Sequence, residues 1–226
     1  MTASMASATI PLSLTKDLLT GAEYGPAETR ELLQRTADIK ARPARYASVL
    51  RNKHIALIFE KPSLRTRVTF EVGIQSMGGF VVFLDHTQAR LGERESIPDV
   101  ARNLERWVQG IVARVYEQRV LEEMAANVAI PVVNALSDKF HPCQALADFF
   151  TLEEKFGSLK GFKLAYVGDG NNVCHSLVYL AARLGVNIRI ATPANYAPDA
   201  GVLADAKRVA KETRAKIELF TDPRKP

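Results

Sequence analysis

Apolar residues along the chain follow two spacings, one typical of buried strands and one typical of amphipathic helices. Short apolar runs predict strands at residues 54–60, 80–84, 110–116, 130–136, 162–168, 186–193 and 215–220. Helical spacing between these runs predicts helices at residues 28–50, 64–77, 96–108, 118–127, 142–156, 173–184 and 198–213. Strands that alternate with helices in this way indicate parallel α/β sheets.

A turn-rich stretch, GSLKG at 157–161, separates two such series. We therefore predict a loose extension at 1–11, one α/β domain at 12–156 and a second at 157–226. Only three of the predicted strands fall in the second domain, whereas a doubly wound sheet has about five or six. The fold class is thus α/β with two parallel-sheet domains, the second incomplete.

Composition narrows the class of protein. The 226 residues are 47% apolar and 24% charged, and no apolar run approaches the roughly 20 residues of a membrane span. The first 15 residues lack the early positive charge and long apolar core of a secretory signal, so we expect a cytoplasmic protein. The isolated Cys143 and Cys174 have no metal-ligand spacing and are expected to be reduced thiols rather than nucleophiles.

The net charge of +5 favours a small anionic substrate over nucleic acid. Residues 28–53 are basic, but Tyr46 is the only aromatic residue among them, whereas nucleic-acid sites usually interleave charge with aromatic side chains.

The stretch FEKPSLRTRVTFE at 59–71 joins a predicted strand to a predicted helix. Pro62 is tolerated at a helix start and Ser63 is a good N-cap, so a helix should begin there. Free N–H groups at this end would bind an anion, and Arg65 and Arg67 add donors suited to phosphate. The alternative is an arginine-rich first turn that pairs with carboxylates such as Glu60 and Glu71.

Further polar residues follow other strands, where ligand sites of parallel sheets lie, and we expect four such strand ends to share one crevice. Arg114 lies inside an apolar run and is costly to bury without a partner. His141 and Gln144 share one face of a first helical turn, either to bind a carbonyl and an amide or as a simple polar cap. VGDGNN at 167–172 is a poor dinucleotide fingerprint because Val173 replaces its third glycine.

Four motifs in this order resemble the carbamoyltransferase family, and most closely its ornithine-using members. They are FEKPSLRTR, the arginine of ARVY at 113–116, HPCQALAD at 141–148 and VGDGNNV at 167–173. The similarity runs from about residue 12 to the end of the chain.

The resemblance implies a site for carbamoyl phosphate with no metal or organic cofactor. The residues that match its carbamoyl-phosphate contacts are Ser63, Leu64, Arg65, Thr66, Arg114, His141 and Gln144. Of these, Arg65, Thr66, Arg114 and His141 would stabilise the transition state of transfer to the δ-amine of ornithine, which gives citrulline and phosphate. Leu64 replaces the usual threonine, at a position that can bind phosphate through its backbone N–H. Asn172 matches an ornithine contact.

The resemblance also implies a homotrimer, or a higher assembly of trimers, in which a loop reaches a neighbouring subunit's site, here presenting Gln88 or Arg90. The family's Asp-x-x-x-Ser-Met-Gly and His-Cys-Leu-Pro segments are absent, so the chain is expected to be truncated at its C-terminus and its activity is in doubt. Carbamoyl transfer to putrescine or an acylated ornithine, and carbamoyl-phosphate binding without catalysis, are the alternatives. A nicotinamide-dependent dehydrogenase is disfavoured by the incomplete glycine fingerprint.

Overall fold

The computed structural model describes residues 16–226, so the predicted extension at 1–11 lies outside the described residues. The first part contains α1 (Pro26–Ala41), α2 (Pro43–Tyr46), β1 (His54–Phe59), α3 (Leu64–Ser76), β2 (Phe80–Asp85), α4 (Ile97–Glu105), β3 (Gly110–Arg114), α5 (Gln118–Asn127), β4 (Val132–Leu136) and α6 (Pro142–Phe156). The second contains β5 (Lys163–Val167), α7 (Asn172–Leu184), β6 (Asn187–Ala191), the 3₁₀ helix η1 (Ala194–Tyr196), α8 (Ala200–Thr213) and β7 (Ile217–Phe220).

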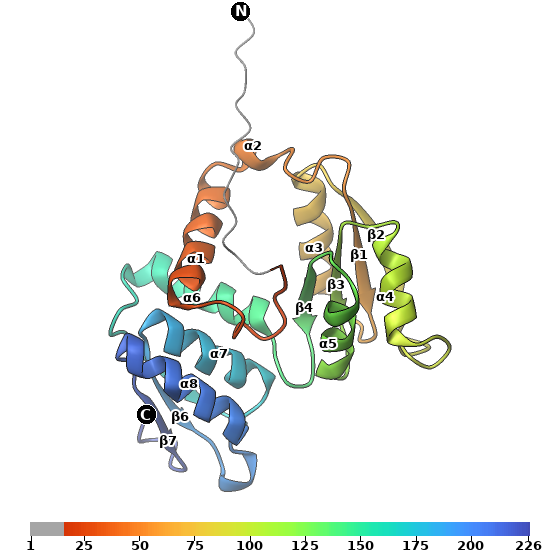
Figure 1. Cartoon of the computed structure of the whole chain (residues 1–226). Coiled ribbons are helices and arrows are strands. Elements are labelled where there is room, and N and C mark those ends of the chain that lie inside the picture. The colour runs from red at the N-terminus through yellow and green to blue at the C-terminus, as the bar shows by residue number, and fades with distance from the viewer. Residues whose placement is uncertain (1–15) are drawn as a thin grey trace, which may run out of the picture.

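These strands form two parallel sheets, which confirms the predicted fold class. The first sheet has the order β2-β1-β3-β4 and the second the order β5-β6-β7. Figure 1 shows α6 leading from the first sheet to the second, with α7 and α8 packed on the second sheet. Because all strands of a sheet run in one direction, the loops after them gather at one edge.

The first sheet is buried on both faces, as expected for a parallel sheet covered by helices. Ile58 and Ile111 belong to the core that includes residues of α4 and α5. Leu57 and Phe59, which point to the opposite face, pack in a second core with Ile74 of α3. The near-continuous apolar run of β1 reflects this two-sided burial.

The predicted helix at 28–50 is wrong in one respect, because the structure divides it at Pro43 into α1 and α2. Proline disfavours the helical conformation of the residue before it. Arg42 accordingly has φ −134° and ψ 56°, outside the helical region.

The segment before α1 connects the two sheets. Leu18 donates its N–H to the carbonyl of Val132, and its own carbonyl accepts the N–H of Asn134, so this segment pairs with β4. A few residues later, the buried Arg183 of α7 donates to the carbonyls of Ala22 and Tyr24. One stretch of chain therefore holds both sheets.

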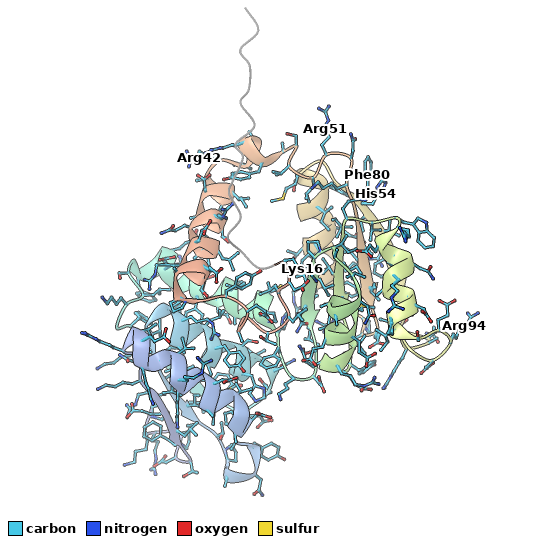
Figure 2. The ribbon with its side chains drawn as sticks, viewed as in Figure 1. Lys16, Arg42, Arg51, His54, Phe80 and Arg94 are labelled. Atoms are coloured by element: carbon cyan, nitrogen blue, oxygen red, sulfur yellow. The ribbon has the colours of Figure 1, made fainter. Side chains whose placement is uncertain are left out.

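The two edges of the first sheet differ in character. At the amino-terminal edge, His54 and Phe80 are exposed and stack with ring centroids 5.1 Å apart (Figure 2). At the carboxyl edge, Glu60 follows β1 with only 3% of its surface exposed. One of its carboxylate oxygens accepts the N–H of Leu91 at 2.9 Å and the other accepts the N–H of Tyr116 at 2.8 Å. The loops after β1, β2 and β3 are thus joined through one carboxylate.

We predict that Glu60→Gln lowers the free energy of unfolding by about 2–3 kcal/mol, because an amide offers one acceptor oxygen to two buried N–H groups. Urea denaturation would measure the loss, with Glu122→Gln on the exposed surface of α5 as the control. Equal stability of the two variants would show that the Glu60 contacts contribute little.

Candidate functional site

One cavity at the carboxyl edge of the first sheet gathers most of the predicted site residues. Its volume is about 480 Å³, and its walls come from the start of α3, the ends of β3 and β4, and the start of α6. The predicted residues that line it are Ser63, Arg65, Thr66, Arg114, His141 and Gln144. The parallel sheet brings them together because it aligns the loops that carry them.

The α3 wall of the cavity is a helix N-terminus. Ser63 is the N-cap, as predicted, and its hydroxyl accepts the N–H of Thr66 at 3.4 Å. The exposed Arg65 lines the cavity from the first turn. The N–H groups and the guanidinium give this wall a positive character suited to phosphate oxygens.

Arg67 does not share this wall. Its Nε donates to Glu71 at 2.8 Å, and its guanidinium carbon lies 3.5 Å from the centroid of the Phe83 ring. The alternative of an arginine paired with a carboxylate therefore holds for Arg67, whereas Arg65 lines the cavity. Glu60 pairs with neither arginine in these contacts, since its oxygens accept backbone N–H groups.

Arg114 and His141 form the most polar part of the cavity. Arg114 Nε and His141 Nδ1 are buried and have no hydrogen-bond partner among residues 16–226. Burial lowers the pKa of Arg114. Burial, and secondarily the charge of Arg114, lowers the pKa of His141 to about 4. At neutral pH the site thus pairs a cationic guanidinium with a neutral imidazole, and both have unused hydrogen-bonding capacity.

The α6 wall adds an amide and a thiol. Gln144 lines the cavity and its Nε2 donates to Asp148 at 2.9 Å, which leaves its carbonyl oxygen as an acceptor. The Cys143 thiol donates to the carbonyl of Asn134, and burial raises its pKa to about 12. Burial raises the pKa of Cys174 likewise to about 12. Both thiols are free, and their protonated state matches the expectation that neither is a nucleophile.

The Leu64 side chain is 80% exposed and does not line the cavity. On the same side of α3, at four-residue spacing, Val68 is 45% exposed and Val72 is 57% exposed. Any contact of residue 64 with a ligand in the cavity would therefore come from its backbone N–H.

Gln88 and Arg90 line a different cavity, of about 350 Å³, within the loop at 85–95. The Arg90 guanidinium lies 4.1 Å from the centroid of the Tyr116 ring, and Lys61 Nζ lies 4.4 Å from the same centroid.

The anchoring of the loop at 85–95 by Glu60 was not predicted from the sequence. An acidic residue directly after an apolar strand was the available signal, but its backbone partners come from distant loops.

Asn172 is also outside the 480 Å³ cavity, although four strand ends were expected to share one crevice. It begins α7, and its Nδ2 donates to the carbonyl of Ser137 at 2.7 Å. The preceding Asn171 is the N-cap of this helix. The motif after β5 therefore contacts the loop before His141 instead of lining the same cavity.

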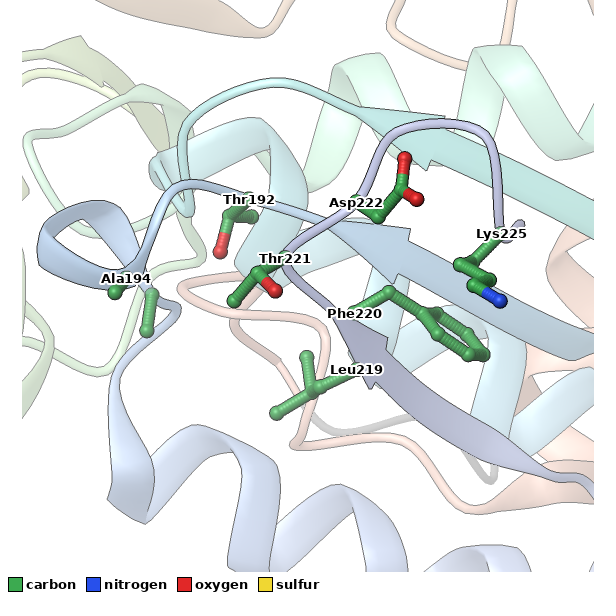
Figure 3. A pocket seen from close by; sticks show the side chains of 8 residues that line it. Thr192, Ala194, Leu219, Phe220, Thr221, Asp222 and Lys225 are labelled. Atoms are coloured by element: carbon green, nitrogen blue, oxygen red, sulfur yellow. The ribbon is translucent and has the colours of Figure 1, made fainter.

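The second sheet has a cavity of its own, about 660 Å³, beyond the ends of β6 and β7 (Figure 3). Thr192, Phe220, Asp222 and Lys225 are among its lining residues, and none of the predicted site residues lines it. Its walls are mainly apolar, without the convergent donors of the first cavity.

No helix within residues 16–226 has the length and apolar character needed to cross a membrane. Within the same residues, no group of three or more His, Cys, Asp or Glu is arranged to hold a metal ion.

Comparison with known proteins gives two family matches that together cover most of the chain. Residues 16–154 match the aspartate/ornithine carbamoyltransferase carbamoyl-P binding domain. Residues 160–226 match the Asp/Orn binding domain of the same family.

Individual relatives agree with these matches. The chain is 51% identical to an ornithine carbamoyltransferase of Thermus thermophilus, over 86% of this chain and 64% of that protein. It is 46% identical to the enzyme of that name from Shewanella oneidensis, over 92% of this chain and 69% of that protein. The solved ornithine carbamoyltransferase of Pyrococcus furiosus superposes with a TM-score of 0.88 at 42% identity, over 93% of this chain and 68% of that one. The chain thus spans about two thirds of the length of these relatives.

The lowered pKa of His141 predicts a pH-dependent contribution to stability. Its folded pKa of about 4 lies below the ordinary value of about 6.5, so the unfolded chain binds more protons between these values. Above about pH 6.5 the titration of His141 should not change the free energy of unfolding. As the pH falls from there toward 4, this titration should lower the free energy of unfolding progressively.

The non-titrating variant His141→Asn should lose less stability over this interval than the wild type. Urea denaturation at a series of pH values would measure both proteins, and other titrating groups cancel in the difference. Parallel pH curves for the two proteins would contradict the assignment of a neutral, buried imidazole.

Proposed function

The chain belongs to the aspartate/ornithine carbamoyltransferase family, and we propose that its 480 Å³ cavity binds carbamoyl phosphate for transfer of the carbamoyl group to ornithine. One observation carries the proposal: a helix N-terminus with Arg65 lines the same cavity as Arg114 and His141, whose Nε and Nδ1 atoms have no hydrogen-bond partner among residues 16–226. The first wall suits a phosphate, and the second suits a carbonyl oxygen that gains charge during acyl transfer.

The phosphate end of the ligand would lie at α3. The hydroxyl of Ser63, the backbone N–H of Leu64 and the guanidinium of Arg65 are the donors that we assign to it. These donors also neutralise charge on the phosphate as it leaves. Because the Leu64 side chain points to solvent, its replacement of threonine leaves the backbone donor in place.

The carbamoyl end would lie near Arg114 and His141. The δ-amine of ornithine attacks the carbamoyl carbon, the carbonyl π electrons move onto oxygen, and the C–O bond to phosphate then breaks. Arg114, a donor nitrogen of His141 and the hydroxyl of Thr66 stabilise the oxyanion. The oxygen of Gln144 accepts from the carbamoyl amide and orients it. The carbonyl re-forms as the C–O bond breaks, the proton lost by the amine passes to the departing phosphate, and the products are citrulline and hydrogen phosphate.

The neutral state of His141 suits this role. A neutral imidazole donates one hydrogen bond without adding a second cation beside Arg114, whose charge disfavours protonation of the ring. Arg114 then provides the positive charge beside the oxyanion, and His141 provides a hydrogen bond that orients the carbonyl oxygen. His141→Ala should accordingly weaken carbamoyl-phosphate binding, through loss of a contact with the carbonyl oxygen, and should reduce turnover by a larger factor.

The ornithine side would be completed from the second sheet, with Asn172 as its contact on this chain. We propose residues 12–156 as the carbamoyl-phosphate domain and residues 157–226 as part of the ornithine domain. The relatives named above are ornithine carbamoyltransferases, which supports ornithine over putrescine or an acylated ornithine as the amine. The pathway would be arginine metabolism in the cytoplasm.

We further propose a homotrimer. Support comes from the apolar stripe of Leu64, Val68 and Val72 on α3, which one copy of the chain leaves exposed to water. The stripe begins beside the cavity, so a neighbouring copy covering it could bring its loop at 85–95, with Gln88 and Arg90, close to the bound ligand.

We predict that Arg65→Ala weakens carbamoyl-phosphate binding roughly 10- to 100-fold, because a charge-assisted phosphate contact is lost. Isothermal titration calorimetry would measure the affinity. Arg67→Ala is the matched control, since Arg67 lies on the same helix but contacts Glu71 and Phe83.

A citrulline assay with ornithine, putrescine and acetylornithine would complete the test. Binding without turnover of any amine would favour a non-catalytic carbamoyl-phosphate protein. Equal affinities for the two arginine variants, or no binding by the wild type, would refute the site.

The trimer predicts that Val72→Glu dissociates the assembly, because three buried carboxylates would face an apolar interface. Sedimentation velocity should give the mass of a trimer for the wild type and of a monomer for the variant. Val167→Glu, at a similarly exposed valine on β5, is the control and should stay trimeric. A monomeric wild type would contradict this part of the proposal.

A further inference from the structure

The first turn of α7 contacts the loop that carries His141. This loop, residues 137–141, connects β4 to α6. Three polar residues of α7 bond to it, although α7 packs on the second sheet and the cavity belongs to the first. The contacts therefore cross from one sheet to the other.

The contacts are short and specific. Asn172 Nδ2 donates to the carbonyl of Ser137 at 2.7 Å. His175 Nδ1 lies 2.9 Å from the carbonyl of Lys139. The hydroxyl of Ser176 accepts the N–H of His141 at 2.9 Å. Each of these three residues thus bonds a different backbone group of the loop.

His175 is held in one tautomer by its surroundings. Its Nδ1 faces a carbonyl and must donate, while its Nε2 accepts the N–H of Asp199 at 3.0 Å. Beside the His175 ring, Lys139 Nζ forms an ion pair with Asp199 Oδ2 at 3.3 Å, and the centroid of the Phe140 ring lies 6.0 Å from the centroid of the His175 ring. The ring is only 7% exposed, so both nitrogens are bonded and shielded from water.

Ser176 is fully buried, and its hydroxyl contacts His141, which lines the cavity. The Nδ1 atom of His141 has no partner within residues 16–226, so no hydrogen bond from that atom sets the ring's direction. The backbone of His141 is restricted on one side by Pro142 and on the other by the bond from its N–H to Ser176. The direction of the imidazole therefore depends on the backbone contact with α7.

The other end of the loop is anchored to α5, which packs against the first sheet. Ser137 is fully buried, and its hydroxyl donates to the Gln118 side chain at 2.7 Å and accepts the N–H of Phe140 at 3.0 Å. The loop is thus bonded to α5 through Ser137 and to α7 through His141. A shift of α7 would move His141 more than it would move the phosphate donors of α3.

We infer that Asn172, His175 and Ser176 are positioning residues that hold His141 at the carbamoyl end of the cavity and so make this end respond to the second sheet. The inference rests on the proposed carbamoyl-phosphate site. It divides the site into two parts. The donors of α3 bind phosphate independently of the second sheet, whereas the contact of His141 with the carbamoyl group depends on the second sheet. It also gives Asn172 a second role, because the amide assigned to ornithine holds the loop of His141.

The test compares two ligands in one variant. Ser176→Ala removes the acceptor of the His141 N–H and should weaken carbamoyl phosphate about three- to tenfold. Affinity for inorganic phosphate, which uses only the α3 donors, should not change. Calorimetry with both ligands would measure this, and Thr29→Val, which removes a fully buried hydroxyl from α1, is the matched control. Equal weakening of both ligands, or of neither, would overturn the inference.

A second measurement does not need carbamoyl phosphate. The ring signals of His141, assigned in NMR spectra through the His141→Asn variant, should titrate near pH 4 in the wild type. In Ser176→Ala and His175→Leu the freed ring should titrate closer to the ordinary value of about 6.5. His175→Asn, which can still donate to the Lys139 carbonyl, should show a smaller shift.

The two experiments separate the failure of the inference from the failure of the proposed function. If wild-type protein binds no carbamoyl phosphate but the His141 titration shifts as expected in the variants, the proposed function fails and the positioning contacts stand. If carbamoyl phosphate binds to the wild type and Ser176→Ala does not weaken it selectively relative to inorganic phosphate, the positioning role is refuted.

Discussion

The carboxylate of Glu60 is the constraint on which the carboxyl edge of the first sheet depends. A buried carboxylate is stable only when its oxygens are bonded, and here both accept backbone N–H groups from other loops. These bonds join the loops after β1, β2 and β3 directly before the helix start that carries Ser63 and Arg65. These bonds restrain the backbone beside Arg114 and before α3, and such restraint would preorganise the proposed phosphate site.

The cavity lined by α3 and Arg114 differs from this anchor, because two of its polar atoms, Arg114 Nε and His141 Nδ1, have no hydrogen-bond partner among residues 16–226. Both residues are partly buried, and their two unbonded nitrogen atoms are fully buried, an arrangement that lowers stability unless a ligand satisfies these atoms. The neutral imidazole limits this penalty, since two adjacent buried cations would repel each other. Stability is thus supplied by Glu60 and the apolar cores on both faces of the sheet, while the cavity retains binding capacity.

Much of the fold could be predicted from apolar spacing and turn chemistry. The strands, the helix start at Ser63 and the helix at 118–127 follow local rules that the sequence displays directly. The exception, the helix broken at Pro43, also had a local cause that we underweighted. Cavity residues after three strands could be grouped because a parallel sheet places such loops at one edge. Which of the two arginines lines the cavity could not be predicted, because Arg67 is drawn to the Phe83 ring of β2 as well as to the nearby Glu71.

The sequence by itself determined which chemical groups this protein has and at which strand ends they lie, since both depend on residue identity and local periodicity. Only the tertiary structure decided which of these groups meet. Asn172 donates to Ser137, 35 residues earlier, and Glu60 accepts from Tyr116, 56 residues later. The lowered pKa of His141 likewise depends on burial beside Arg114. Burial and hydrogen bonding are properties of groups that folding brings together, and no local pattern in the chain records them.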